Sequence, residues 1–411
     1  MALEALKGWT PTARHTVTAS YLAWTLDAYD FFLLTLVFKD IAAQFGTTIT
    51  NVAVATMLTL VCRPIGAFIF GRLADHFGRR PVLMLDIALY SVLSFAIAFT
   101  PNIYVFYIAC AAFGVAMGGV WGICASLSME TVKPEARGFV SGLLQSGYPS
   151  GFLVSALIFG YLYPVLGWRG MFMVGVIPAA LLIVYIYACV PESRFFSRES
   201  AKQKQAGTFA ILRAHGKVAL FAILLMTGFN FFSHGTQDVY TTFLRVQHGF
   251  DPSTVKNILV IGNIGAIIGG LFFGSFSQGF GRRKTIILMA LLALPVIWFW
   301  SHGSTPLMLA VGAFLMQVCV QGAWGVVPAH LNELAPAAAR GTFAGTVYQL
   351  GNLIAAVNAP LQTGIAEHFN KDYSLALAIV ATCAALLIAV LAWLGPEAKN
   401  VDMGAAGASA K

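Results

Sequence analysis

The sequence has little charge, since only 10% of its 411 residues are Asp, Glu, Lys or Arg. A soluble domain carries roughly 25%, so an ordinary soluble globular protein is excluded. Cysteine is also sparse: the six cysteines all fall in apolar segments, and no two have the spacing of metal ligands. We therefore interpret them as small hydrophobic residues, and we expect neither disulfides nor a metal centre.

Apolar residues are abundant instead, at 58% of the chain with a mean hydropathy of +0.77. A membrane-spanning helix needs about 20 mostly apolar residues. Twelve segments have this character, near residues 17–40, 52–71, 82–100, 104–127, 138–161, 170–190, 218–244, 256–276, 285–301, 306–330, 341–364 and 373–395. The sequence therefore predicts an all-α integral membrane protein with twelve transmembrane helices.

The net charge of +8 would suit a nucleic-acid-binding protein, but its distribution indicates a membrane protein. With the N-terminus in the cytoplasm, nineteen of the 25 Lys and Arg residues fall at cytoplasmic positions, five fall outside, and Arg63 lies within a helix. This asymmetry follows the positive-inside rule. We expect a multi-pass protein of the plasma membrane (the inner membrane in a bacterium), with both termini cytoplasmic, no cleaved signal peptide and no nucleic-acid partner.

A repeat with an offset of 203 residues relates the two halves of the chain. GRLADHFGRR (71–80) aligns with GSFSQGFGRR (274–283), and Trp121 aligns with Trp324 in the same register. The repeat predicts two pseudo-symmetric six-helix bundles. We place them at 1–190 and at 218–411, the latter with a short cytoplasmic tail, and we expect 191–217 to be a cytoplasmic linker. Secondary transporters are often built from such halves, with the substrate near the bilayer midplane.

The first-half loop resembles the signature G-x-L-A-D-x-x-G-R-R of the major facilitator superfamily, and Glu130/Arg137 and Glu333/Arg340 resemble that superfamily's cytoplasmic charge network. The resemblance implies the superfamily's twelve-helix fold. We expect Gly71 and Gly78 to allow close approach and a tight turn, and a weaker lock where Gln278 replaces Asp75. The gating or anchoring residues would be Gly71, Asp75, Gly78, Arg79, Arg80, Glu130, Arg137, Glu333 and Arg340. The alternative is that the loop arginines only hold the topology.

Three charged residues lie well inside the first two apolar segments, away from the segment ends. Asp27 and Asp30 are three apart and share one helix face. Two carboxylates on one face repel each other, so we expect one to hold a proton and act as a proton carrier, with Asp27 as the first candidate and Asp30 as the second. Arg63 should lie at membrane depth, where a guanidinium needs an anion. That anion would be Asp27, Asp30 or a substrate carboxylate; the alternative is a purely structural ion pair.

The segment NFFSHGTQDVYTT (230–242) places several polar groups inside another apolar run. Asn230, His234 and Asp238 are four apart and form one stripe, and Ser233 and Gln237 form an adjacent one. The repeat aligns Asn230 with Asp27, so both faces should line a central cavity. His234 is able to change charge near physiological pH, and Asp238 would orient it. The alternative is a satisfied polar cluster that packs this helix against a neighbour.

The same segment resembles the helix 7 signature of Jen-type lactate/pyruvate:proton symporters, and AWTLDAYDFFLLTLVFKDIA (23–42) is similar to that group and to its sialic acid:proton relatives. The resemblance implies symport of a short monocarboxylate such as lactate, pyruvate or acetate with a proton. It implies that Arg63 matches the family's helix 2 arginine, which we expect to bind the substrate anion, and that Asn230, His234, Gln237 and Asp238 line the path or support coupling. An alternative within the superfamily is a sialic acid or aromatic acid permease.

Weaker candidates for lining the cavity share only a polar or amphipathic side chain within a span: Gln145, Tyr148, Asn263, Gln317, Gln321, Trp324, Tyr348, Gln349 and Asn352. Helix packing is the alternative for each. An intramembrane enzyme would need a nucleophile–base pair or a metal motif, and neither occurs, so we do not expect an enzyme. We expect no cofactor apart from the proton as co-substrate, and a monomer suffices for the mechanism.

Overall fold

The computed structural model describes residues 9–132, 136–192, 216–335 and 340–397. The regular elements of these ranges are helices, which confirms the predicted all-helical class. The first half contains α2 (Pro11–Leu36), α3 (Phe38–Phe45), α4 (Ile49–Phe77), α5 (Arg79–Ile97), α6 (Ile103–Met117), α7 (Val120–Thr131), α8 (Arg137–Val174) and α9 (Val176–Cys189). The second half contains α12 (Gly216–Gln237), α13 (Tyr240–Thr242), the π-helix η2 (Phe243–Gln247), α14 (Pro252–Phe280), α15 (Arg282–Ser301), α16 (Pro306–Trp324), α17 (Val327–Leu334), α18 (Arg340–Ala355), α19 (Asn358–His368) and α20 (Tyr373–Leu394).

The helices begin where the local sequence provides caps. Thr10, Asp251 and Thr305 each precede a proline, and each side chain accepts a hydrogen bond from a backbone N–H of the first turn. This arrangement satisfies donors that have no partner within the helix, and proline suits the first helical position. Some spans are also broken part-way along their length, for example at Gly118 and Gly119 between α6 and α7.

In the described part of the chain, nine helical segments are long and apolar enough to cross a membrane, or ten when the bent pair α2 and α3 counts as one. One segment, 138–189, has 52 residues. At 1.5 Å per residue it would be about 80 Å long, far more than a bilayer core of about 30 Å. Gly167 breaks it with φ +62°, so it provides two spans. Together with α18 and α19, these segments account for the twelve predicted helices.

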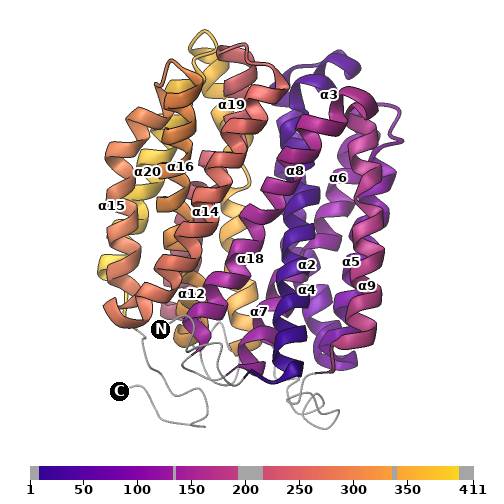
Figure 1. Cartoon of the computed structure of the whole chain (residues 1–411), viewed down its shortest axis with the longest axis vertical. Helices are drawn as coiled ribbons and strands as arrows, with labels where there is room; N and C mark the ends of the chain where they lie inside the picture. Colours follow the sequence, from indigo (N-terminus) through magenta and orange to yellow (C-terminus); the bar gives the residue numbers. More distant parts are fainter. Residues whose placement is uncertain (1–8, 133–135, 193–215, 336–339, 398–411) are drawn as a thin grey trace.

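The helices form two bundles that meet along the middle of the molecule (Figure 1). In the first, α2 packs on α8, and α4 packs on α6; in the second, α14 packs on α16, and α12 packs on α18 and α20. Most of the linker predicted at 191–217 and the predicted tail lie outside the described residues. The helices α3 and α19 lie at one end of the molecule (Figure 1).

The bundles contact each other mainly through α8 on α14 and through α4 on α18 and α19. At the first contact a Cβ on Gly142 would lie 2.8 Å from the Gly270 carbonyl oxygen, so the backbones approach more closely than any other residue allows.

Candidate functional site

A buried ion pair lies beside the junction of the bundles, in the first one. The Arg63 guanidinium on α4 lies 3.3 Å from a carboxylate oxygen of Asp27 on α2, and the two side chains are 2% and 0% exposed. The sequence left three possible anions for Arg63, and the structure places Asp27 there. An isolated charge at this depth would be costly, so the pair explains how both residues are accommodated.

The remaining surroundings of Arg63 are aromatic and weakly polar. Its guanidinium lies 5.3 Å from the centre of the Phe31 ring and donates to the Met117 sulfur at 3.5 Å. The phenol groups of Tyr148 and Tyr348 lie within electrostatic range. Among the described residues, neither Nε of Arg63 nor Oδ1 of Asp27 has a hydrogen-bond partner. A guanidinium carries five N–H donors, so Arg63 retains the capacity to bind a second carboxylate.

Asp30 has a different partner from Asp27. The Ser94 hydroxyl on α5 donates to it at 2.8 Å, and its side chain is buried against Gly175. The two acids share a helix face by sequence, but they bond to different helices. In this conformation, therefore, Asp30 is not the anion that pairs with Arg63, which was one of the sequence-based alternatives.

The polar stripe of the second half lies on α12 and just beyond its end. His234 Nδ1 lies 3.1 Å from the Asp238 carboxylate, and the His234 ring packs edge-on against Phe31 of the first half at 5.5 Å. Gln237 donates to Gln317 of α16 at 2.8 Å. The stripe therefore reaches the junction at His234 and is tied to its own bundle at Gln237.

Asn230 is turned toward its own helix, where its amide donates to the Met226 carbonyl at 2.9 Å. Ser233 makes a long contact of 3.5 Å with Gln237 on the same helix. Asn230 is therefore the repeat counterpart of Asp27 by position, but among the described residues its side chain has no equivalent interaction across helices. The π-helix η2 follows the segment directly, and such irregular turns are frequent at functional sites.

Aromatic rings from both halves, and an amide of the second half, lie near the junction. Tyr348 of α18 stacks on Trp121 of the first half at 4.5 Å and contacts Trp324 of its own half at 5.9 Å. The two repeat-related tryptophans thus meet on one tyrosine. Tyr148 stacks on Trp24 at 5.5 Å. Gln321 is buried, and within the described ranges neither polar atom of its side chain has a partner.

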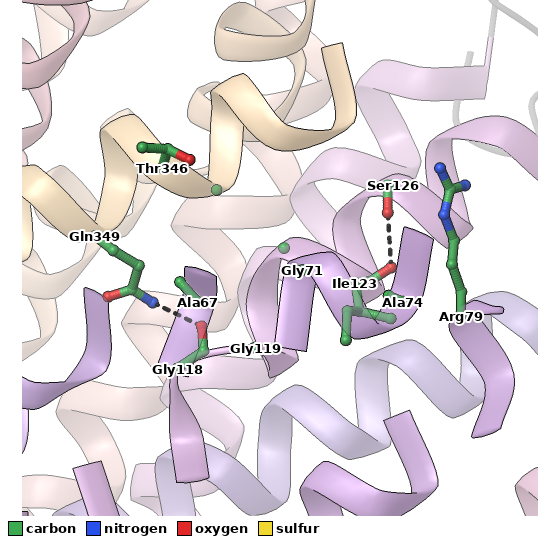
Figure 2. Close-up of a pocket in the computed structure, with 12 residues that line it drawn as sticks. Ala67, Gly71, Ala74, Arg79, Gly118, Gly119, Ile123, Ser126, Thr346 and Gln349 are labelled. Atoms are coloured by element: carbon green, nitrogen blue, oxygen red, sulfur yellow. Dashed lines mark hydrogen bonds between the residues drawn. The ribbon is translucent and has the colours of Figure 1, made fainter. Parts of the chain in front are cut away.

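A cavity with about 550 Å³ of empty space, part of it open to solvent, lies between the bundles near the 71–80 loop. Gln349 of α18 donates to the Gly118 carbonyl at 3.3 Å, and Asn352 donates to Gln349 at 3.3 Å. Figure 2 shows Gln349 directed at Gly118 on one side of this cavity and Arg79 on the other. The break between α6 and α7 is therefore held by a residue of the opposite bundle.

The loop residues form anchored turns in both halves. The Glu192 carboxylate accepts from the backbone N–H groups of Arg79 and Arg80 at 2.9 and 3.2 Å, and the Arg80 guanidinium donates to the Tyr187 carbonyl. Glu397 accepts from the N–H groups of Arg282 and Arg283, at 3.2 Å in each case. The side chains of four candidates lie outside the described residues, namely Asp75, Glu130, Arg137 and Arg340.

The second-half loop contains an ion pair, while the expectation that its lock is weaker than that of the first half stays a prediction because the side chain of Asp75 lies outside the described residues. Arg282 binds Glu333 through two N–O contacts of 3.0 Å, and it also donates to Gln278 at 2.7 Å. Gln278 stands at the repeat position of Asp75. Its amide oxygen accepts a hydrogen bond from Arg282, so a glutamine at this position still interacts with the arginine.

The two loop glycines differ in what they do. Gly78 has φ +102°, and a Cβ there would lie 2.4 Å from the Glu192 carboxylate, so this turn requires glycine. A Cβ on Gly71 would meet nothing within 4 Å. The expectation that Gly71 permits a close helix approach is therefore wrong for this conformation, in which Gly71 lines the cavity instead.

Two features of the site escaped the sequence analysis. Arg245 of η2 binds Asp40 of α3 through contacts of 2.8 and 3.3 Å, which link the bundles at the end opposite the 71–80 loop. Its signal was weak because the partners are 205 residues apart. Asp86 of α5 is fully buried. It stands in the apolar run PVLMLDIALY, so the criterion that selected Asp27 would have found it.

The six cysteines are free. In the ranges that the structure covers, no group of three or more His, Cys, Asp and Glu side chains is arranged to hold a metal ion.

Comparisons with known proteins identify the family. The model of the Major Facilitator Superfamily matches residues 21–243 and 223–408. The chain is 28% identical over 401 residues to a "Carboxylic acid transporter protein homolog" of Saccharomyces cerevisiae, covering 90% of this chain but only 64% of the yeast protein. It is 25% identical to the sialic acid transporter NanX of Escherichia coli, and the alignment covers 95% of this chain and 96% of NanX. It is 28% identical to the cis,cis-muconate transport protein of Acinetobacter baylyi, and the alignment covers 84% of this chain and 85% of that protein.

Among solved structures, the xylose transporter XylE from E. coli, in a partially occluded inward open conformation, has a TM-score of 0.76 to this chain at 17% identity. The likeness covers 96% of this chain and 100% of XylE. At this identity it shows the fold alone, which is the predicted twelve-helix, two-bundle arrangement. The chain therefore belongs to the Major Facilitator Superfamily, and it is a multi-pass membrane transporter rather than an enzyme.

Proposed function

We propose that the protein is a proton-coupled symporter of short monocarboxylates, such as lactate, pyruvate or acetate, and that it works by alternating access. The observation that carries this proposal is the single 3.3 Å contact between Arg63 and Asp27, which leaves Nε of the buried guanidinium without a partner among the described residues. A carboxylate is the ligand that best matches the remaining donors.

The coupling follows from competition for Arg63. A substrate carboxylate that binds the guanidinium displaces Asp27, which would then be a buried anion without a cation. Asp27 avoids that cost by taking up a proton. Binding of the anion and binding of the proton therefore favour each other, which is the thermodynamic condition for symport. His234 and Asp238 face the same junction across Phe31 and are the second candidates for the proton.

Two features support alternating access in this conformation. The bidentate contact between Arg245 and Asp40 joins the bundles at one end, and the cavity lined by Gly71 and Arg79 lies toward the other. By the distribution of Lys and Arg, we assign the first end to the outside and the second to the cytoplasm. The protein then faces inward or is nearly occluded, and rocking of the bundles would reverse this.

The relatives support an organic acid as the substrate class, because their names refer to carboxylic acids, sialic acid and muconate. The aromatic lining by Phe31, Tyr148 and Tyr348 favours a compact acid over a polyhydroxylated one, since a sugar acid needs many hydrogen-bond partners. The second candidate, a sialic acid or aromatic acid permease, has in its favour the coverage of NanX over nearly its whole length.

A competition assay separates these substrates. Purified protein in liposomes would be given radiolabelled L-lactate, with an excess of pyruvate, acetate, sialic acid or benzoate. We expect pyruvate and acetate to inhibit uptake, and sialic acid and benzoate to leave it unchanged. Uptake of labelled sialic acid or benzoate in the absence of lactate uptake would overturn the monocarboxylate assignment.

A further inference from the structure

Asp86 is a third buried carboxyl group near Arg63, and it differs from the other two in having no hydrogen-bond partner among the described residues. Asp27 bonds to Arg63, and Asp30 accepts from Ser94. Neither oxygen of Asp86 has a hydrogen-bond partner in the part of the chain that the structure describes, and the residue is 0% exposed. Buried polar groups are nearly always hydrogen-bonded, so this exception needs an explanation.

The protonation state of Asp86 is limited by this environment. An ionised carboxylate without a donor is strongly disfavoured away from water, so the neutral acid fits this conformation. Its charged form becomes accessible only when water reaches it. A carboxyl group that is dry in one state and wet in another is suited to hold a proton and then to release it.

Water has a short route to Asp86 through the break between α6 and α7. A Cβ on Gly119 would lie 2.5 Å from Oδ2 of Asp86, so the carboxyl group lies directly behind this glycine. Gly119 also lines the cavity between the bundles, as Figure 2 shows. Glycine has no side chain, so only a short stretch of backbone separates the acid from the cavity.

The groups that face Asp86 tie its charge to the substrate site. The titratable groups within electrostatic range of Asp86 are Asp27 of α2, Arg63 of α4, Tyr90 of its own helix and Cys124 of α7. Arg63 and Asp27 are the two charged residues of the proposed substrate site. In the structure Asp27 bonds to Arg63 while Asp86 has no partner, which is the arrangement expected once a proton has left Asp27 for Asp86.

We propose that Asp86 is the proton-release residue of the transporter, which accepts the proton from Asp27 and delivers it to the cavity past Gly119. The O–H bond of protonated Asp27 breaks and one forms on the Asp86 carboxylate; Asp27 then rebinds Arg63 and displaces the substrate anion. The Asp86 O–H bond breaks next, and the proton passes to water in the cavity. This inference rests on the proposed proton-coupled function.

The test compares Asp86→Asn with Ser91→Ala, which changes another buried polar residue of the same helix, one to which the proposal gives no role. Each full-length protein is reconstituted in liposomes. We expect Asp86→Asn to lower lactate accumulation driven by an acid-outside gradient by roughly 10-fold or more. Exchange of internal for external lactate at equal pH should continue, because one anion can leave Arg63 and another can replace it while Asp27 keeps its proton. Ser91→Ala should behave as wild type in both assays.

A second readout does not depend on the substrate. Infrared difference spectra recorded across a pH titration should contain a carbonyl band from a protonated carboxyl group that is lost in Asp86→Asn and kept in Ser91→Ala. Identical spectra or wild-type accumulation in Asp86→Asn would overturn the inference. If the wild type accumulates none of the acids, the proposed function fails, and the infrared titration still decides whether Asp86 holds a proton.

Discussion

The guanidinium of Arg63 and the carboxylate of Asp27 meet across α4 and α2 through one contact of 3.3 Å, although an arginine and a carboxylate can form two. The geometry is thus weaker than that of Arg245 with Asp40, where both contacts are formed. A buried pair with one contact missing holds its partners in place and still admits a competing anion. This property makes Arg63 the expected anchor of the substrate.

Replacing Arg63 with Ala should abolish concentrative uptake of the acid while the protein still folds. The substrate would lose charge-assisted hydrogen bonds worth about 1.5–3 kcal/mol, or roughly 10- to 150-fold in affinity. Folding survives because Asp27 can become neutral once its partner is gone. Arg72→Ala is the matched control, since Arg72 is an exposed arginine on the same helix. Normal uptake by Arg63→Ala would remove Arg63 from the substrate site.

Replacing Asp27 with Asn should uncouple transport from the proton gradient. The amide fills the same space beside Arg63 but cannot take up a proton, so accumulation should fall to the level without a gradient. Binding of the anion should persist or tighten, because the competing carboxylate is gone. The measurement is lactate accumulation at matched and at opposed pH. Acid-driven accumulation at the wild-type level would move the carrier role to Asp238 or His234.

The contact of Arg245 with Asp40 should stabilise closure of the bundles at the end of α3 and α19. The side chains are 10% and 19% exposed. We therefore expect the pair to stabilise the closed arrangement by about 1–3 kcal/mol, between the values for surface and buried ion pairs. Spin labels at Ala43 and His368, both exposed, would report the separation by pulsed EPR in a cysteine-free background. Arg245→Ala should lengthen the distance and Lys39→Ala should not, whereas unchanged distances in both would show that the pair is not a gate.

The loop glycines should respond in opposite ways to alanine. Gly78→Ala introduces a side chain at φ +102° and against Glu192, which costs about 1–3 kcal/mol. Gly71→Ala adds a methyl group to open space within a helix and should leave the melting temperature unchanged or slightly higher. Thermal unfolding in detergent measures both. Equal destabilisation by the two substitutions would contradict this account of the turn.

The sequence was sufficient for the fold and for one side of the site. Hydropathy and the 203-residue repeat predict the twelve helices, because membrane spans must be long and apolar whatever their neighbours are. The meeting of Arg63 with Asp27 was foreseeable for a similar reason, since each charge is too costly alone at that depth.

Contacts between distant segments were beyond the sequence. Nothing in the chain indicates that Ser94 would take Asp30 away from Arg63, or that Asp40 would find Arg245 205 residues later. These pairs depend on the rotation of each helix and on how the bundles are docked. Asn230 illustrates the same limit. Its position on the helix predicts a side chain that faces the junction, but its amide bonds to the backbone of its own helix.

The measurement that tests the central claim most directly is proton-driven uptake in proteoliposomes. Labelled L-lactate would be supplied outside at acidic pH, with a neutral interior, and a pH-sensitive dye inside would record proton entry. The account predicts accumulation above equilibrium together with acidification of the interior, and loss of the accumulation when a protonophore is added. Lactate that only equilibrates, with no proton entry and no effect of the protonophore, would contradict it.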